Sequence, residues 1–102
     1  MPVDMPVHYA TQERLRVLCR VVDISCHGAR LLNYVGLERG AIVRLSMPGL
    51  AARKAEIVWS DDYSAACKFD KPLSERDVAE LAIRFGHVVE PDRPIEDMIL
   101  VA

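Results

Sequence analysis

The stretch Asp23-Ile24-Ser25-Cys26-His27-Gly28 joins two apolar segments of the chain. Residues 15–22 before it alternate in polarity along part of their length, and Ala29, Leu31 and Leu32 follow it. Alternation of this kind predicts a strand with one buried face. We therefore expect one strand to enter the stretch and another to leave it, with a turn from Asp23 to Gly28 between them.

Two roles are open for the acid and the hydroxyl in this turn. Asp and Ser side chains commonly bond to nearby backbone groups in tight turns. Alternatively, the carboxylate of Asp23 and the hydroxyl of Ser25 present an acceptor and a donor to a ligand. Gly28 is expected to be structural in both cases, because glycine adopts a positive φ without strain and lets another group approach the backbone closely.

Further short strands separated by turns account for the rest of the first seventy residues. Two of the turns are marked by glycine: one has Gly36 and Gly40 at its ends, and the other contains the Pro48-Gly49 pair. The strands are predicted at residues 6–11, 15–22, 29–35, 41–47, 53–59 and 63–69. Several short strands at this spacing predict an all-β fold, a small barrel or sandwich.

The fifth predicted strand carries two further expectations. Ala55, Ile57 and Trp59 fall on one face of it, so Trp59 is expected in the core. Arg53 and Lys54 are interpreted as a solvated strand edge, where charges discourage pairing with another chain.

A helix follows the strands. Ser74 is expected to cap it, since Asp77 stands three residues later. Val78, Leu81, Ala82 and Phe85 recur at helical spacing, so this face is expected to pack on the strands. Gly86 is expected to end the helix. The sequence thus predicts one domain over residues 1–86 and a tail, docked or loose, over residues 87–102.

Composition limits the classes of function. A chain of 102 residues fits one domain, and its net charge of −2 argues against binding to a nucleic acid polymer or an anionic membrane. Three irregularly spaced cysteines indicate reduced thiols. The sequence shows neither a signal peptide at its start nor an apolar run of the ~20 residues that span a bilayer, so we expect a cytoplasmic protein without membrane insertion.

No set of residues predicts catalysis or metal binding. The cysteines form no C-x-x-C pair, and the spacing of His8, His27 and His87 fits no known zinc site. A Cys–His nucleophile would need an orienting group and an oxyanion site, which the sequence does not assemble. We expect no enzyme activity, no metal and no cofactor.

In this context the chain resembles the PilZ domain family, bacterial receptors for the second messenger cyclic di-GMP. The family motif D/N-x-S-x-x-G matches Asp23, Ser25 and Gly28. Residues 22–25, 28–31, 37–40, 57–59 and 68–69 also read like the family. The resemblance implies a six-stranded antiparallel β-barrel with one C-terminal helix, and cyclic di-GMP as a ligand of the motif residues.

The family's second motif, R-x-x-x-R just before the first strand, has no counterpart in this sequence. Residues 2–7 resemble the segment that follows those arginines, and a start upstream of Met1 would place the arginines outside this sequence. Arg16 and Arg20 have the literal spacing, but they fall in a predicted strand close to Asp23. We interpret that match as coincidence.

Without these arginines, the expected affinity for cyclic di-GMP is lower. In the family they stack on guanine and neutralise phosphate, which suits a planar group with paired donors. Asp23 and Ser25 alone would leave affinity near millimolar, since each charge-assisted bond contributes roughly 1.5–3 kcal/mol. Arg30 is the first candidate to supply more, with Arg14, Arg16 and Arg20 as others.

Two functions therefore remain open. One is a PilZ-type signalling module that binds cyclic di-GMP, with weakened affinity, through Asp23, Ser25, Gly28 and Arg30. The other is an adaptor that binds no nucleotide and acts through a protein partner in motility, pilus or exopolysaccharide control.

Overall fold

A computed structural model describes residues 1–14, 16–32 and 37–86 of the chain. The described residues form, in order, β1 (Pro2–Ala10), β2 (Val17–Ile24), β3 (Gly28–Leu32), β4 (Ile42–Ser46), β5 (Arg53–Ser60), β6 (Ser64–Phe69) and α1 (Glu75–Phe85). The predicted tail, residues 87–102, lies outside the described residues, as do Leu15 of the second predicted strand, residues 33–35 of the third and Gly36 of the turn after it.

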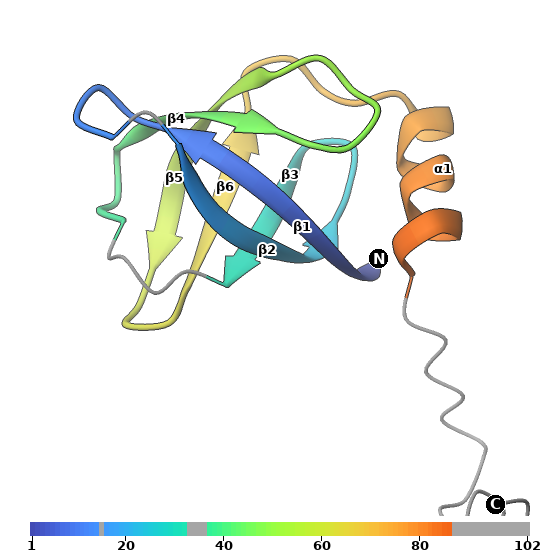
Figure 1. Ribbon diagram of the computed structural model, residues 1–102, viewed down its shortest axis with the longest axis horizontal. Helices are drawn as coiled ribbons and strands as arrows, with labels where there is room; N and C mark the ends of the chain where they lie inside the picture. Colours follow the sequence, from blue (N-terminus) through green and yellow to red (C-terminus); the bar gives the residue numbers. More distant parts are fainter. Residues whose placement is uncertain (15, 33–36, 87–102) are drawn as a thin grey trace, which may run out of the picture.

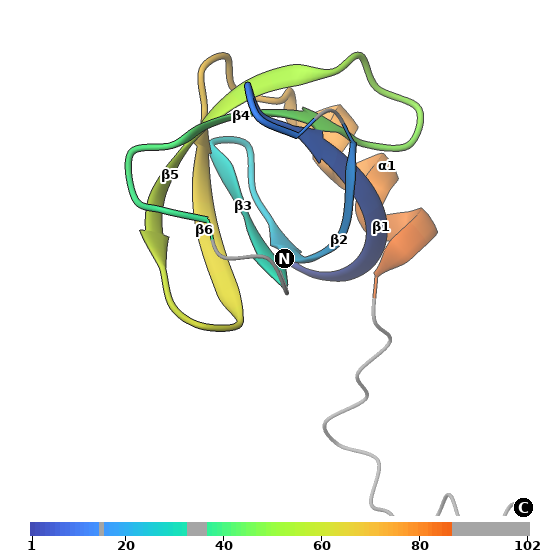
Figure 2. The same cartoon turned by 60° about the vertical axis from the view of Figure 1, so that its left-hand side comes forward.

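The strands close into one antiparallel barrel, in the order β1-β2-β3-β6-β5-β4 and back to β1 (Figure 1). Four neighbouring pairs are consecutive in the chain, and the pairs β3–β6 and β1–β4 close the ring. Figure 2 shows α1 outside the ring beside β1, the strand that it contacts. The prediction of a six-stranded antiparallel barrel with a C-terminal helix is confirmed.

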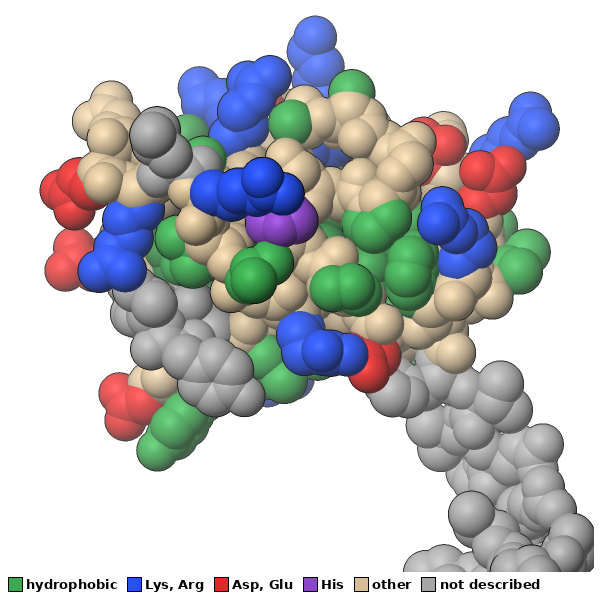
Figure 3. All heavy atoms as spheres, in the orientation of Figure 1, with side chains coloured by type: hydrophobic (Ala, Val, Ile, Leu, Met, Phe, Trp, Pro, Cys, Tyr) green, Lys and Arg blue, Asp and Glu red, His purple; other side chains and the backbone are tan. Residues whose placement is uncertain are grey.

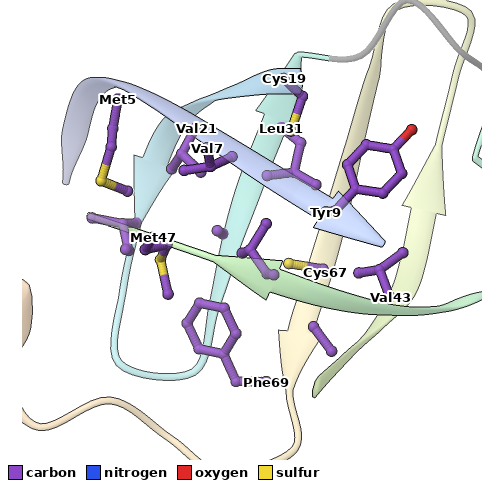
Figure 4. Close-up of a cluster of buried hydrophobic side chains, with 14 of the residues drawn as sticks. Met5, Val7, Tyr9, Cys19, Val21, Leu31, Val43, Met47, Cys67 and Phe69 are labelled. Atoms are coloured by element: carbon purple, nitrogen blue, oxygen red, sulfur yellow. The ribbon is translucent and has the colours of Figure 1, made fainter. Parts of the chain in front are cut away.

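The core fills the inside of this barrel. Because side chains alternate along a strand, every second residue points inward. In β1 these are Val3, Met5, Val7 and Tyr9, each at most 1% exposed. Figure 4 shows inward side chains from around the ring meeting inside it, among them Met5, Val7, Tyr9, Cys19, Val21, Leu31, Val43, Met47, Cys67 and Phe69.

Strand boundaries differ from the predictions around the Asp23–Gly28 stretch. The first strand begins at Pro2, not at residue 6, because Pro2 is the Cα partner of Asp23 on β2. The second continues to Ile24, so the prediction that Asp23 lies in the turn is wrong. Gly28 begins β3, which leaves a turn of only three residues, 25–27.

The strand pairing shifts register at three places: between Pro2 and Met5 on β1, and at bulges on β2 and β5 that interrupt the alternation. On β2, Val21 is partnered by Leu31 and Asp23 by Arg30, so Val22 is an extra residue. On β5, the pairing with β6 shifts in the same way between Ile57 and Trp59. An extra residue reverses the direction of the side chains that follow it.

The bulge on β5 overturns the expectation for Trp59. Ile57 is fully buried, but Val58 and Trp59 are 40% and 45% exposed. Strict alternation from Ile57 would have placed Trp59 inside the barrel. The extra residue instead turns the indole to the outer surface.

The interpretation of Arg53 and Lys54 as a strand edge is also wrong. β5 pairs with β4 on one side and with β6 on the other. The Arg53 guanidinium lies 5.8 Å from the centre of the Phe69 ring, and it donates to the carbonyl of Lys71 at 3.0 Å. Arg53 is therefore packed, whereas Lys54 is exposed.

The helix begins and ends as predicted. The Ser74 hydroxyl accepts a hydrogen bond from the amide of Asp77 at 3.1 Å, which confirms the N-cap. Gly86 follows the last helical residue with φ −63°, and its amide donates to Ala82 at 2.8 Å. Gly86 also forms an antiparallel bridge with Val3, which ties the end of α1 to β1. Among the described residues, no helix is long and apolar enough to cross a bilayer.

Leu81 and Ile83 provide a test of how α1 packs. Leu81 is 2% exposed and Ile83 is 84% exposed. We expect Leu81→Ala to lower the free energy of unfolding by about 2–4 kcal/mol, because it leaves a cavity. Ile83→Ala should change it by less than about 0.5 kcal/mol. Urea denaturation followed by circular dichroism measures both, and equal effects would contradict the packing described.

Candidate functional site

Asp23 and Arg30 face outward side by side. The bulge at Val22 turns Asp23 to the outside of β2, where its Cα partner on β3 is Arg30. The Asp23 side chain is 54% exposed. Its carboxylate lies 2.5 Å from the amino group of Met1, with which it forms an ion pair. A charged acceptor is thus held at the surface, next to a guanidinium on the neighbouring strand.

The hydroxyl of Ser25 is occupied within the turn. It donates to the carbonyl of Gly28 and accepts from the amides of His27 and Gly28, each at 3.3 Å. One donor and two acceptor positions are all that a hydroxyl has. A bond from Ser25 to a ligand would therefore have to replace one of these contacts.

Of the two reasons predicted for Gly28, the close approach of another group to its backbone is confirmed, and the positive φ is wrong. Its φ is not positive; among the described glycines, only Gly40 and Gly49 have positive φ. A Cβ on Gly28 would instead overlap the backbone carbonyl oxygen of Cys67 on β6. The glycine thus allows β3 and β6 to approach each other closely beside the turn.

The side chain of Arg30 extends over the outer surface of β6 to the ring of Trp59. Ala66 on β6 is the Cα partner of both Arg30 and Trp59, so it stands between them. The Arg30 guanidinium lies 5.8 Å from the centre of the Trp59 ring, a cation–π distance. Because Ala66 is small, the long arginine side chain can pass over it.

The carboxylate of Asp61 interacts electrostatically with the guanidinium of Arg30. The pKa of its carboxyl is lowered, chiefly because it accepts hydrogen bonds from the amides of Tyr63 and Ser64. The charge of Arg30 lowers it further by a smaller amount. Arg30 is thus placed between a cation–π partner and an ionised carboxylate.

The motif residues line one shallow, open depression of about 530 Å³. The structure brings together Asp23, Ser25, Gly28 and Arg30 there, the four site residues predicted from the sequence. Lys68 joins them, because it is the Cα partner of Gly28. Sequence reasoning missed Lys68 as a site residue, since only the pairing of β3 with β6 places it beside the turn.

Arg16 and Arg20 lie away from this depression. Arg20 forms an ion pair with Asp4 of β1, and its Nε donates to that carboxylate at 2.6 Å. A guanidinium nitrogen of Arg16 lies 3.3 Å from Nε2 of His8. Neither arginine lines the depression that Asp23 and Arg30 share.

Comparison with known proteins identifies the family. Residues 1–85 match the profile of the PilZ domain. The chain belongs to the PilZ domain family. No curated protein matches it. PilZ domains are in general signalling modules that bind cyclic di-GMP.

The depression offers part of what cyclic di-GMP requires. Guanine presents N–H donors that a carboxylate accepts, and an O6/N7 edge that a guanidinium recognises. Asp23 and Arg30 supply these two groups from neighbouring strands. Lys68 adds a cation, which can approach a phosphate. These residues fit the chemistry of the nucleotide.

Two of the three thiols of this PilZ domain are buried and kept protonated. Burial, with a smaller contribution from nearby Cys67, raises the pKa of Cys19 to about 12. Burial also raises the pKa of Cys67. Cys26 in the turn is half-buried. Within residues 1–14, 16–32 and 37–86, no group of three or more His, Cys, Asp or Glu side chains is arranged to hold a metal ion.

Substitution of Gly28 tests the close approach of β3 to β6. We expect Gly28→Ala to reduce the free energy of unfolding by about 1–3 kcal/mol, because the new methyl group forces the two backbones apart. Lys68→Ala, on the exposed side chain opposite, is the control and should cost less than about 0.5 kcal/mol. Chemical denaturation measures both. An unchanged midpoint for Gly28→Ala would show that the strands are not in close contact.

The cysteines should differ in reactivity. Thiolates, not thiols, attack alkylating reagents, and a raised pKa keeps the thiol protonated. At pH 8 we expect iodoacetamide to modify native Cys26 well before Cys19 or Cys67, as measured by mass spectrometry of peptides. In urea all three should react at similar rates. Early modification of Cys19 in the native protein would contradict its burial.

Proposed function

We propose that this PilZ domain is a bacterial signalling module that binds cyclic di-GMP weakly on the Asp23–Arg30 surface. The observation that carries the proposal is the pairing of these two residues across β2 and β3, facing outward over one depression. The proposal makes the protein a binding module and not an enzyme. It also requires a cytoplasmic location, in agreement with three free thiols.

Each side chain has a distinct part in the proposed complex. The Asp23 carboxylate accepts from the N1–H and N2–H₂ groups of one guanine. Arg30 donates to the O6/N7 edge or to a phosphate, which its planar paired donors suit. Lys68 contributes a point charge toward a phosphate. Gly28 and Ser25 shape the turn on which Asp23 is presented.

Two features lower the expected affinity. Asp23 must exchange its contact with Met1, and the hydroxyl of Ser25 is already occupied within the turn. Two charge-assisted bonds leave affinity near millimolar after the cost of association. A third bond, from Arg30, adds roughly 1.5–3 kcal/mol and brings the dissociation constant to tens of micromolar.

A second candidate function is an adaptor that binds no nucleotide. The contacts of Ser25 and Asp23 within the protein favour it, because they give both motif residues structural roles without a ligand. Such an adaptor would act through a protein partner in motility, pilus or exopolysaccharide control. The exposed side chains of Trp59 and Tyr63 are of the type enriched where proteins bind one another.

Isothermal titration with cyclic di-GMP at physiological salt tests the first function. We expect a dissociation constant between about 10 and 100 μM, because three charge-assisted contacts contribute. Asp23→Ala should abolish measurable binding, and Arg30→Gln should weaken it by about tenfold, the loss of one such bond.

Arg76→Gln on α1 is the matched control for Arg30→Gln, since it removes one exposed guanidinium away from the depression. It should leave the affinity unchanged. Absence of heat at millimolar nucleotide would overturn nucleotide binding and leave the adaptor function. Binding that survives Asp23→Ala would show that the nucleotide uses another surface.

A further inference from the structure

Two cations face each other on the outer surface at β4 and β5. Arg44 and Lys54 are Cα partners in the antiparallel pair, and both side chains are exposed. Residues paired in this way have Cβ atoms about 4.5–5.5 Å apart, and like charges at that distance repel. Figure 3 shows several of the Lys and Arg side chains along the upper edge of the molecule, where Figure 1 places β4 and the beginning of β5.

No acid of the described chain neutralises this pair. Glu56 lies two residues along β5 from Lys54, opposite Ile42, and Asp70 donates its amide to the Lys54 carbonyl at 2.9 Å. Within the described residues, no carboxylate oxygen lies within 4.0 Å of a side-chain nitrogen of Arg44 or Lys54. As far as the described part of the chain goes, the two charges are therefore left to solvent or to a binding partner.

The pair has no evident structural purpose. Charged side chains protect strand edges, but β4 and β5 are both paired on each side in the closed barrel. The backbone of these strands is likewise already hydrogen-bonded, so a partner has to be recognised through side chains. Local arrangements that oppose stability in this way are expected mainly at functional sites.

A pocket of about 830 Å³ adjoins the pair. Ile42, which is 46% exposed, and the buried Leu37 and Val43 contribute apolar surface to it. Arg14, from the connection between β1 and β2, adds a third cation. Glu13 and Glu38 also line the pocket, so its acids and its cations Arg44 and Lys54 come from different elements, with the two cations on β4 and β5.

We propose that Arg44, Lys54 and this pocket form a docking site for an acidic segment of a partner protein. Carboxylates of the segment pair with Arg44 and Lys54, and an apolar side chain between them enters the pocket beside Ile42. Charge complementarity selects the acid, and the apolar lining selects a polypeptide with mixed side chains. The site lies at the end of β1 away from Asp23, so it does not depend on nucleotide binding.

The test uses the full chain and a designed probe, a fluorescent eight-residue peptide of alternating Glu and Leu. A Gln/Leu peptide of the same length is the control. We expect the Glu/Leu peptide to bind with amide NMR shifts centred on Ile42, Arg44 and Lys54, and the Gln/Leu peptide to bind at least about fivefold more weakly, because two ion pairs are lost.

Matched protein variants complete the test. Arg44→Gln with Lys54→Gln should weaken peptide binding by about five- to tenfold, whereas Arg76→Gln with Arg84→Gln on α1, the same change in charge, should not. The first double variant should also melt at or above the wild-type temperature, because it relieves repulsion.

The proposal would be overturned if the two peptides bound equally well, or if the two double variants lost peptide binding to the same extent. It would also be overturned if the protein bound phosphatidylserine vesicles and neither peptide. A lower melting temperature for Arg44→Gln with Lys54→Gln would also overturn it, because the pair would then serve the fold. Failure of the peptide to bind leaves the nucleotide titration unaffected, so the two functions are tested separately.

Discussion

The alternation of side chains in a closed barrel is the constraint on which the rest of this structure depends. Each strand has a neighbour on both sides, so a residue points either into the core or to solvent. On β2 and β5, bulges at Val22 and Val58 interrupt the strict alternation of inward and outward side chains. They turn Asp23 and Trp59 outward on either side of Arg30, and the bulge on β2 thereby brings Asp23 to the candidate nucleotide surface.

The pairing of β3 with β6 holds that surface together. Gly28 lets the two strands approach where a side chain would meet the carbonyl of Cys67. The turn is also tied to the segment before α1, since the Cys26 carbonyl accepts from Leu73 at 2.7 Å and the His27 carbonyl from Phe69 at 2.8 Å. The motif therefore serves the fold whether or not a ligand is present.

Local patterns in the sequence predicted most of the helices and strands. They did not predict the contacts between strands that are far apart in the sequence. Polarity period and turn residues located the six strands, the helix and the Ser74 cap. They could not show that the carbonyl of Cys67 is the group that approaches Gly28 or that Lys68 faces it, because β3 and β6 meet across 31 intervening residues. The bulge that exposes Trp59 and the pairing of Arg44 with Lys54 likewise appear only when β5 is aligned with its neighbours.

The two surfaces lie near opposite ends of β1. Asp23 is paired with Pro2, whereas the pocket beside Arg44 includes Tyr9 and Ala10. Eight residues of extended strand separate these ends by roughly 26 Å. Coupling over that distance requires an element with two arrangements, and a strand hydrogen-bonded within a closed ring does not provide one. Binding at the two surfaces should therefore be additive, so the domain could hold a protein partner whatever the level of nucleotide.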